Sequence, residues 1–457
     1  YAWIGRSVTL PSTVEIIQGT NSSTLDIAAS ERIGAVYQTL LNNYVEGVDK
    51  EALIEGALSG MVEAVGDPYS QYLNTEESEN LDETISASFE GIGAEIMSLN
   101  QQIVIVSPIK GSPAEKAGLL PNDIILSADG ESLQGLTASE AVALIRGEKG
   151  SEVVLEIVRG DQTFKANITR DTIPIETVTF ELDEEYPEIG IVHVSSFSTP
   201  TYDDIVSAVT DLRTQGATSF VFDFRQNPGG LLDQALKISN MFLDDGDVIM
   251  QTQEKDAEPN KIVASESEFG DFKITEPSVL LVDEGSASAS EIVAGALQES
   301  SEIPLVGTTT FGKGTVQTVY PLTESSELKL TVAKWLTPNG NWIHQKGIAV
   351  DYEVALPEYA TLTIIDSTAT YEEGTVSEEV KNVEAMLNAI GYAVEADGYY
   401  DEATAEQVAS FQAANELDAT GIVTGDTALA IVEKLREVLT ENDTQYDNAV
   451  EILMGNE

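Results

Sequence analysis

The sequence predicts a multidomain α/β protein. Its 457 residues suffice for two to four domains. Helical spacing of apolar residues dominates the first part, short strands between Gly/Pro turns follow, and strands then alternate with helices. The expected units are an N-terminal helical segment for packing or dimerisation (1–87), a β-rich domain (88–172), an α/β core (173–360), a linker (361–373), a small all-α domain (374–440) and a polar tail (441–457).

The N-terminal segment carries apolar stripes at helical spacing. Ile33, Val36 and Leu40 form one, and Leu53, Ala57 and Met61 fall in another. Stripes without an obvious partner favour core or subunit contacts, so we expect a homodimer. Residues 1–5 are mostly apolar and do not begin with Met, from which we expect a signal or anchor segment upstream.

The β-rich domain is indicated by strands such as 103–106 and 153–158 beside turn residues. Two helices are expected within it, at 114–118 and 137–146. Thr137 precedes the second helix and Glu140 follows three residues later, which is the spacing of a capping box.

The α/β core is indicated by buried-strand runs that alternate with helical patterns. A largely parallel sheet follows from this alternation, and such sheets place their sites at the carboxyl ends of the strands. The expected strands are 189–194, 220–224 and 279–282, and the expected helices are 202–214, 231–242 and 290–298.

Composition narrows the function. The formal charge of −55 disfavours nucleic acid and anionic lipid as partners. The absence of Cys removes thiolate metal sites, disulfides and cysteine nucleophiles, and only two His are present. No compact calcium loop occurs, so neither a metal nor another cofactor is expected.

Ser288 and Lys313 are the candidate nucleophile and base. A serine hydroxyl needs a base, and a lysine amine serves only when burial brings its pKa down from about 10.4. Lys313 has apolar neighbours and flanking glycines, and Gln317 follows four residues later, where its amide can orient the amine. Taken singly, Lys313 also fits a surface loop and Ser288 a capped helix start.

A glycine-rich turn supplies the third element. Residues 226–230, Gln-Asn-Pro-Gly-Gly, follow one buried strand and precede a helix. The N–H groups of Gly229 and Ala289 are candidate donors to an oxyanion. An ordinary strand-to-helix turn is the alternative.

These segments together resemble the carboxyl-terminal processing peptidases, or tail-specific serine proteases, over roughly residues 30–360. The resemblance implies a crotonase-like protease core with an inserted PDZ domain, and endoproteolysis of proteins selected by their C-termini. It assigns Ser288 as nucleophile, Lys313 as general base, Gln317 as orienting residue, and Gly229 with Ala289 as oxyanion hole. The matching segments are 227–230, 285–291, 312–317 and 346–351, with small departures at Gln226 and Val350.

Two ambiguities remain at this stage. Ser286 and Ser290 lie beside Ser288, and only the family correspondence selects Ser288. A Ser-His triad would need His193 or His344 as base, although structural roles are the better interpretation of both.

Residues 89–94 resemble the carboxylate-binding loop of a PDZ domain. The resemblance implies that a substrate's C-terminal tail adds a strand beside 92–96. The expected contacts are Phe89, Gly91, Ile92 and Gly93 from the loop, and Ala141, Leu144 and Ile145 from the helix. We also expect Arg146 to contact the protease core and to link tail binding to assembly of the active site; a plain surface arginine is the alternative.

Residues 376–436 resemble a peptidoglycan-binding domain, with a generic three-helix bundle as the alternative. The predicted protein is therefore a serine endopeptidase of the bacterial cell envelope, anchored or secreted through a segment before Tyr1. Two other functions remain open. One is an inert PDZ and peptidoglycan-binding scaffold, and the other is crotonase-type chemistry on a thioester.

Overall fold

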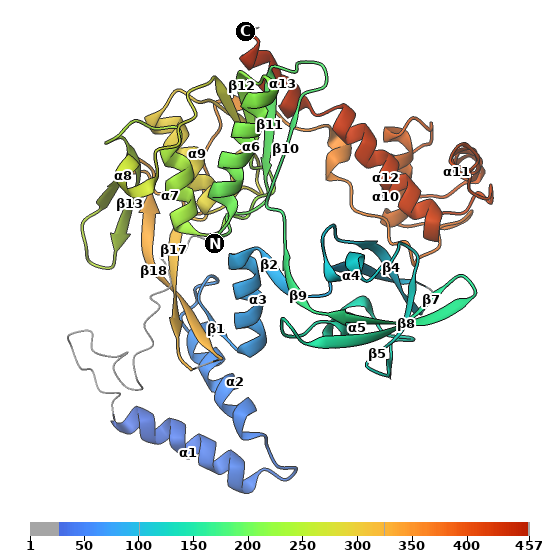
Figure 1. Cartoon of the computed structure of the whole chain (residues 1–457), viewed down its shortest axis with the longest axis horizontal. Coiled ribbons are helices and arrows are strands. Elements are labelled where there is room, and N and C mark those ends of the chain that lie inside the picture. The colour runs from blue at the N-terminus through green and yellow to red at the C-terminus, as the bar shows by residue number, and fades with distance from the viewer. Residues whose placement is uncertain (1–26, 100, 324, 456–457) are drawn as a thin grey trace.

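The computed structural model describes residues 27–99, 101–323 and 325–455. Figure 1 shows an α/β core, a β-rich unit in the position of the expected PDZ domain (the PDZ unit) and a C-terminal helical unit, with two N-terminal helices extending from the core. The expected anchor remnant at residues 1–5 lies outside the described residues. Within the described ranges, no helix combines the length and apolarity that crossing a membrane requires.

The N-terminal segment ends inside the protease core. Its elements are α1 (Ile27–Asn43), α2 (Lys50–Glu63), β1 (Gln71–Leu73) and α3 (Thr75–Ser86). Asp49 caps α2, which buries none of its residues, and a capping box of Asn74 and Glu77 starts α3. β1 pairs with β18 (Glu327–Leu336), about 250 residues later in the chain. The segment is therefore helical only in part, since β1 completes the antiparallel sheet that contains β18.

The PDZ unit has a five-stranded meander, β3-β4-β5-β7-β8, with β3 at its edge, and β6 pairs with β5. The capping box at Thr137 and Glu140 is confirmed. β2 and β9 pair with each other and connect the unit to the core. The bounds are β2 (Ser88–Gly91), β3 (Ala94–Leu99), β4 (Gln102–Pro108), α4 (Pro113–Lys116), β5 (Ile124–Ala128), β6 (Glu131–Ser132), α5 (Ala138–Ile145), β7 (Glu152–Arg159), β8 (Gln162–Thr169) and β9 (Asp171–Pro174).

The core sheet has the strand order β10-β11-β12-β15-β16-β19. Only β10 runs antiparallel, so the predicted largely parallel sheet is confirmed. One face packs against α6, α7 and α9 through a continuous apolar core. The bounds are β10 (Val178–Leu182), β11 (Ile189–Val194), α6 (Thr201–Gln215), β12 (Ser219–Asp223), α7 (Leu232–Asn240), β15 (Ser278–Val282), α9 (Ala289–Ser300), β16 (Leu305–Gly307) and β19 (Tyr352–Glu353).

A second, antiparallel sheet lies beside the core. Its strand order is β1-β18-β13-β14, and β17 also pairs with β18. Lys313 lies two residues before the start of β17, and Gln317 lies within the strand. The bounds are β13 (Val248–Glu254), β14 (Asn260–Val263), α8 (Glu266–Phe269) and β17 (Thr315–Pro321).

The C-terminal unit has its own core, built on η2 (Glu358–Thr361), α10 (Glu378–Ala389), α11 (Glu402–Ala414) and α12 (Gly425–Glu441). The predicted polar tail is wrong for residues 444–453, which form α13 (Thr444–Leu453). Ala449 and Val450 of α13 pack on the second face of the core sheet, against Val221 and Leu281. The few apolar residues of α13 do not predict a packed helix from the sequence alone, because the sheet face that they cover is distant in the chain.

Candidate active site

Ser288 lies at the turn from β15 into α9, at the carboxyl end of the parallel sheet. Its φ of 57° and ψ of −110° are unusual for a residue with a side chain. Such strain persists only where surrounding contacts impose it, and it is concentrated at functional sites. The residue is fully buried.

The two neighbouring serines have structural partners. Ser286 Oγ donates to the carbonyl oxygen of Phe224 at 2.8 Å, and Ser290 Oγ donates to that of Asn227 at 2.9 Å. Both hydroxyls thus hold the 224–227 turn against the start of α9. This arrangement favours Ser288 over its neighbours as the nucleophile.

Lys313 is 4% exposed. Burial, with the charge of Lys329 as a second cause, lowers the pKa of Lys313 to about 8, although Glu291 and Asp67 act in the opposite direction. Its Nζ lies 4.9 Å from the centroid of the Tyr69 ring. Trp335 Nε1 donates to its carbonyl oxygen at 2.8 Å and fixes the backbone. The amine is thus set for proton transfer near neutral pH.

Glu291, buried in the first turn of α9, joins the backbone of Ser288 to that of Lys313. Its Oε2 accepts from the backbone N–H groups of Ser288 and Lys313, both at 2.8 Å. Its Oε1 accepts from Thr310 Oγ1 and from the N–H of Gly312, both at 2.6 Å. Burial raises the pKa of Glu291 against these hydrogen bonds. A carboxylate that accepts four hydrogen bonds is nevertheless the form that suits the site.

Gln317 is fully buried on β17. Its Nε2 donates to the hydroxyls of Thr315 and Thr331, each at 3.0 Å. Its Oε1 is buried and accepts no hydrogen bond. Gln317 follows Lys313 by four residues in the sequence. Its buried Oε1, which accepts no hydrogen bond, is suited to receive an N–H of a lysine amine.

The turn of residues 226–230, the predicted oxyanion turn, places Gly229 against Ser288. A Cβ at Gly229 would lie 2.5 Å from Ala287 O and 2.9 Å from Ser288 Cβ, so only glycine fits there. The Gly229 N–H, however, donates to Asn227 Oδ1 at 2.9 Å. One predicted oxyanion donor is therefore engaged within the protein, while Ala289 begins α9, where backbone N–H groups lack helical acceptors.

The two histidines have partners of their own. His193 Nδ1 lies 3.6 Å from Asp223, which raises the pKa of the histidine. Burial opposes ionisation of Asp223, but His193 and Arg225 hold its pKa at about 2. His344 stacks on Trp342 and its Nδ1 accepts from the Gly314 N–H at 3.4 Å. These contacts favour structural roles for both.

The predicted peptide-binding residues of the PDZ unit divide into three groups. Phe89 and Gly91 lie in β2 and pair with β9, while Ile92 and Gly93 form the turn into the edge strand β3. Ala141 and Ile145 are buried in the PDZ core. The expectation that these two meet a peptide is therefore not met, because positions four apart on α5 share its inward face. Leu144 is half-buried.

Arg146 contacts α3 rather than the α/β core. Its Nη1 lies 2.9 Å from both carboxylate oxygens of Glu83, and its guanidinium lies 4.7 Å from the centre of the Phe89 ring. α3 in turn reaches the core, since the Thr199 N–H donates to Ile85 O at 2.8 Å. The predicted direct contact of Arg146 with the protease core is therefore wrong, and the route of contacts from Arg146 to the core passes through Glu83 and α3.

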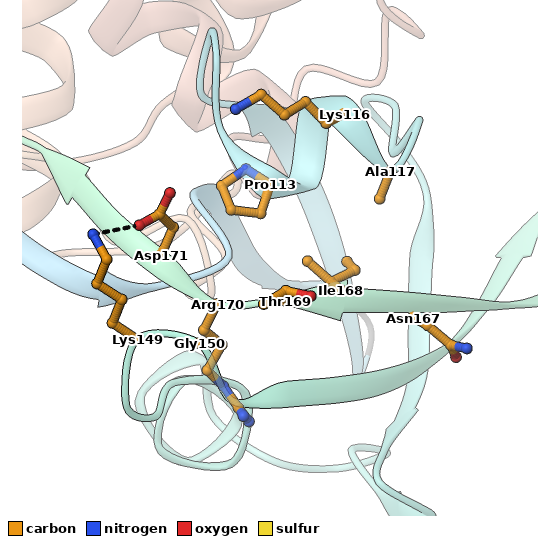
Figure 2. A pocket seen from close by; sticks show the side chains of 10 residues that line it. All are labelled: Pro113, Lys116, Ala117, Lys149, Gly150, Asn167, Ile168, Thr169, Arg170 and Asp171. Carbon is orange, nitrogen blue, oxygen red and sulfur yellow. Dashed lines mark ion pairs between the residues drawn. The ribbon is translucent and has the colours of Figure 1, made fainter.

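A pocket of about 500 Å³ opens on the PDZ unit between α4 and β8 (Figure 2). Two of its cations are already held: Lys149 pairs with Asp171 at 2.8 Å, and Arg170 Nε donates to Ile145 O. None of the predicted site residues lines it.

The sequence analysis assigned no role to Glu291, or to the turn of residues 67–70 that carries Tyr69. An acidic residue within an otherwise apolar helix is a signal for Glu291, since a buried charge needs partners. Nothing local distinguishes Asp67 and Tyr69, because their role depends on the distant pairing of β1 with β18.

Known proteins match nearly the full length of the chain. Residues 188–354 match peptidase family S41, 104–159 a PDZ domain, 6–77 the N-terminal domain of the activating protease CtpB, and 376–431 a peptidoglycan-binding domain. The carboxy-terminal processing protease CtpA of Bacillus subtilis is 44% identical over 96% of this chain and 93% of its own. The "Probable CtpA-like serine protease" of Staphylococcus aureus strain N315 is 37% identical over 96% and 87%.

Among solved structures, the photosystem II D1 C-terminal processing protease is 28% identical, with a TM-score of 0.42 over 71% of this chain and 88% of that chain. The near full-length identity to CtpA is decisive, because it spans the protease core, the PDZ domain and the C-terminal domain together. The chain belongs to the carboxy-terminal processing proteases of peptidase family S41, which are serine proteases.

Proposed function

We propose that the protease acts through a Ser-Lys-Gln centre, with Ser288 as nucleophile, Lys313 as general base and Gln317 as orienting residue. The observation that carries the proposal is the Glu291 carboxylate, which accepts from the backbone N–H groups of both Ser288 and Lys313. A lysine whose pKa is about 8 is a competent base near neutral pH.

In the proposed reaction, the neutral amine of Lys313 takes the proton of Ser288 as Oγ attacks the scissile carbonyl carbon. The oxyanion is stabilised by the N–H groups of Ala289 and Gly229. Gly229 must first leave Asn227 Oδ1, to which it now donates. The lysine ammonium then protonates the departing amine, and water releases the acyl group from Ser288 with Lys313 again as base.

Substrate tails are proposed to add to the edge strand β3 of the PDZ domain, beside the turn at Ile92 and Gly93. A route from this domain to the oxyanion turn supports the regulatory role of Arg146. Arg146 pairs with Glu83 of α3. The carbonyl oxygen of Ile85, also on α3, accepts a hydrogen bond from the Thr199 N–H. Two residues before Thr199, the Phe197 N–H donates to Gly229 O at 3.0 Å. A displacement of α3 is thereby transmitted to Gly229, whose N–H must leave Asn227 Oδ1 before it can stabilise the oxyanion.

The proposed location is the cell envelope, because the chain carries a peptidoglycan-binding domain. A homodimer is proposed through α1 and α2. Their exposed apolar residues include Ile33, Val36 and Tyr44 on α1 and its end, and Ile54 and Met61 on α2. A solvated face of this kind is suited to a second copy.

The test is cleavage of a protein with an apolar C-terminal tail by the wild type, Ser288→Ala and Lys313→Ala. The wild type is expected to cleave, and both variants to lose at least a thousandfold in kcat/KM while still binding the tail. Cleavage that persists in Ser288→Ala would assign the nucleophile elsewhere. Absence of cleavage by every form, with tail binding intact, would favour the inert scaffold.

A further inference from the structure

The turn of residues 67–70, between α2 and β1, reaches the catalytic lysine. Ser70 Oγ donates to Asp67 Oδ2 at 2.6 Å, and the Tyr69 N–H donates to Asp67 Oδ1 at 3.2 Å. The ring of Tyr69 lies under Lys313 Nζ. The turn is held in place by the pairing of β1 with β18, of which Tyr72 opposite Leu328 is the central pair.

Thr331 of β18 connects this turn to Gln317. Its backbone N–H donates to Ser70 Oγ at 3.0 Å, and its Oγ1 accepts from Gln317 Nε2 at 3.0 Å. Burial acts to raise the pKa of Asp67, but hydrogen bonds from Ser70 and from the Thr331 side chain outweigh it and lower that pKa. Asp67 is therefore an ionised acceptor.

These contacts fix the direction of each proton. An ionised carboxylate only accepts hydrogen bonds, so the Thr331 hydroxyl directs its proton to Asp67 and offers a lone pair to Gln317. Thr315 Oγ1 accepts the second Nε2 proton of Gln317. Both amide donors are used, and Oε1 is left as the buried acceptor without a partner. The reversed amide would lose the Thr331 contact, because the hydroxyl proton of Thr331 is directed to Asp67 and could not be donated to Oε1.

We propose that Asp67 is a positioning residue of the catalytic centre: through Thr331 it sets the amide of Gln317 so that Oε1 receives the Lys313 amine. This inference rests on the proposed Ser-Lys-Gln centre. It assigns to the N-terminal segment a part in catalysis beyond packing, because the turn that follows α2 completes the orientation of the base.

The test compares Thr331→Val, which keeps the shape and removes the hydroxyl, with Thr331→Ser, which keeps the hydroxyl. Thr331→Val is expected to lower kcat about tenfold with KM unchanged, and Thr331→Ser to stay within about twofold of the wild type. On a Gln317→Ala background, Thr331→Val is expected to have no further effect. Equal activities of the two Thr331 variants, or effects that multiply in the double variant, would overturn the inference.

A second measurement uses Asp67→Asn, with Asp161→Asn at an exposed turn of the PDZ domain as control. The charged groups that act on Lys313 are Lys329, Glu291 and Asp67, with the Tyr69 ring against Nζ. Because Asp67 raises the pKa of Lys313, its loss is expected to move the rise of kcat to lower pH and to reduce its plateau. An unmoved profile with an unchanged plateau would contradict the inference.

Ser288→Ala distinguishes failure of the proposed Ser-Lys-Gln centre from failure of the positioning role of Asp67. If Ser288→Ala remains active, the proposed centre itself fails. If Ser288→Ala is inactive while Thr331→Val matches Thr331→Ser, the centre stands and the role of Asp67 fails.

Discussion

At the residue scale, the centre keeps a lysine in surroundings that disfavour its charge. An ammonium prefers water, and a buried lysine loses that solvation. The folded state therefore binds the lysine proton more weakly than the unfolded chain does. The proposed activation of Ser288 by Lys313 therefore carries a cost in stability, as expected of active sites.

Lys313→Met is expected to stabilise the protease core. With a folded pKa of about 8 against 10.5, the native lysine destabilises fully below pH 8 and progressively less as the pH rises to 10.5. A difference of that size corresponds to at most about 3 kcal/mol, so a gain of about 1–3 kcal/mol is predicted at pH 7.

The measurement is denaturant unfolding at pH 7 and pH 10.5, followed by fluorescence of Trp335 and Trp342. The gain is expected to shrink at the higher pH. A variant less stable than the wild type at pH 7 would contradict this account of the lysine.

Glu291→Gln is expected to weaken the positioning of Ser288 and Lys313 and to remove a negative charge that acts on the Lys313 amine. An amide nitrogen in place of one oxygen would face two N–H donors, so two hydrogen bonds are lost. The plateau of kcat should fall roughly 10- to 100-fold, or about 1.4–2.8 kcal/mol. Since Glu291 raises the pKa of Lys313, the rise of activity should also move to lower pH.

A pH–rate profile beside Glu302→Gln, an exposed neighbour, checks this prediction. The control should match the wild type. If Glu291→Gln gave the wild-type plateau, Glu291 would have no part in joining the nucleophile to the base.

Among single residues, Ser288, Lys313 and Gln317 could be singled out from the sequence because family motifs surround them. Glu291 and Asp67 could not, since their value lies in which backbone or side-chain groups meet them in three dimensions. The hydrogen bond from the Gly229 N–H to Asn227 Oδ1 could not be predicted from the sequence either, because it depends on the rotamer of the Asn227 side chain.

At the element scale, the central strands and the covering helices of the parallel core sheet follow from periodicity, whereas the strands of the antiparallel sheet were not predicted. α6 begins one residue before and ends one residue after the predicted range, and β11 matches its prediction in full. α13 was missed because about three helical turns of mixed polarity carry little signal alone. It is fixed by Asp443, which pairs with Arg225 at 2.7 Å just before the oxyanion turn.

Arg146→Ala tests the link through α3. The loss of its ion pair with Glu83 should reduce stimulation by an apolar C-terminal tail about 5- to 10-fold, a typical coupling between sites. Cleavage of a short peptide without such a tail should be unaffected.

Glu83→Gln serves as the matched variant on the other side of the pair, and it should behave as Arg146→Ala does. The measurement compares one substrate with its native tail and with an amidated tail. Unchanged tail dependence in both variants would remove α3 from the route.

At the scale of the whole molecule, a strongly acidic chain exposes an apolar surface on its N-terminal helices. The chain carries a net charge of −55, yet α1 and α2 present apolar side chains to solvent. The domain order was predictable from sequence. The return of α13 to the core sheet and the pairing of β1 with β18 in the antiparallel sheet were not, because both depend on contacts between distant segments.

The double variant Ile54→Glu with Met61→Glu is expected to give a monomer where the wild type is a dimer, because it places charge on the apolar face of α2. Light scattering coupled to size-exclusion chromatography measures the mass. Glu51→Gln, at the start of α2, is the control and should remain dimeric. A monomeric wild type would contradict the homodimer.

The central claim is that the buried amine of Lys313 activates Ser288. The most direct test is the rate of covalent labelling by a fluorophosphonate across pH, with the modified residue located by mass spectrometry. The adduct is predicted on Ser288, with a rate that rises through about pH 8 in the wild type and is lost in Lys313→Met. Labelling at another residue, or an unchanged rate in Lys313→Met, would contradict the account.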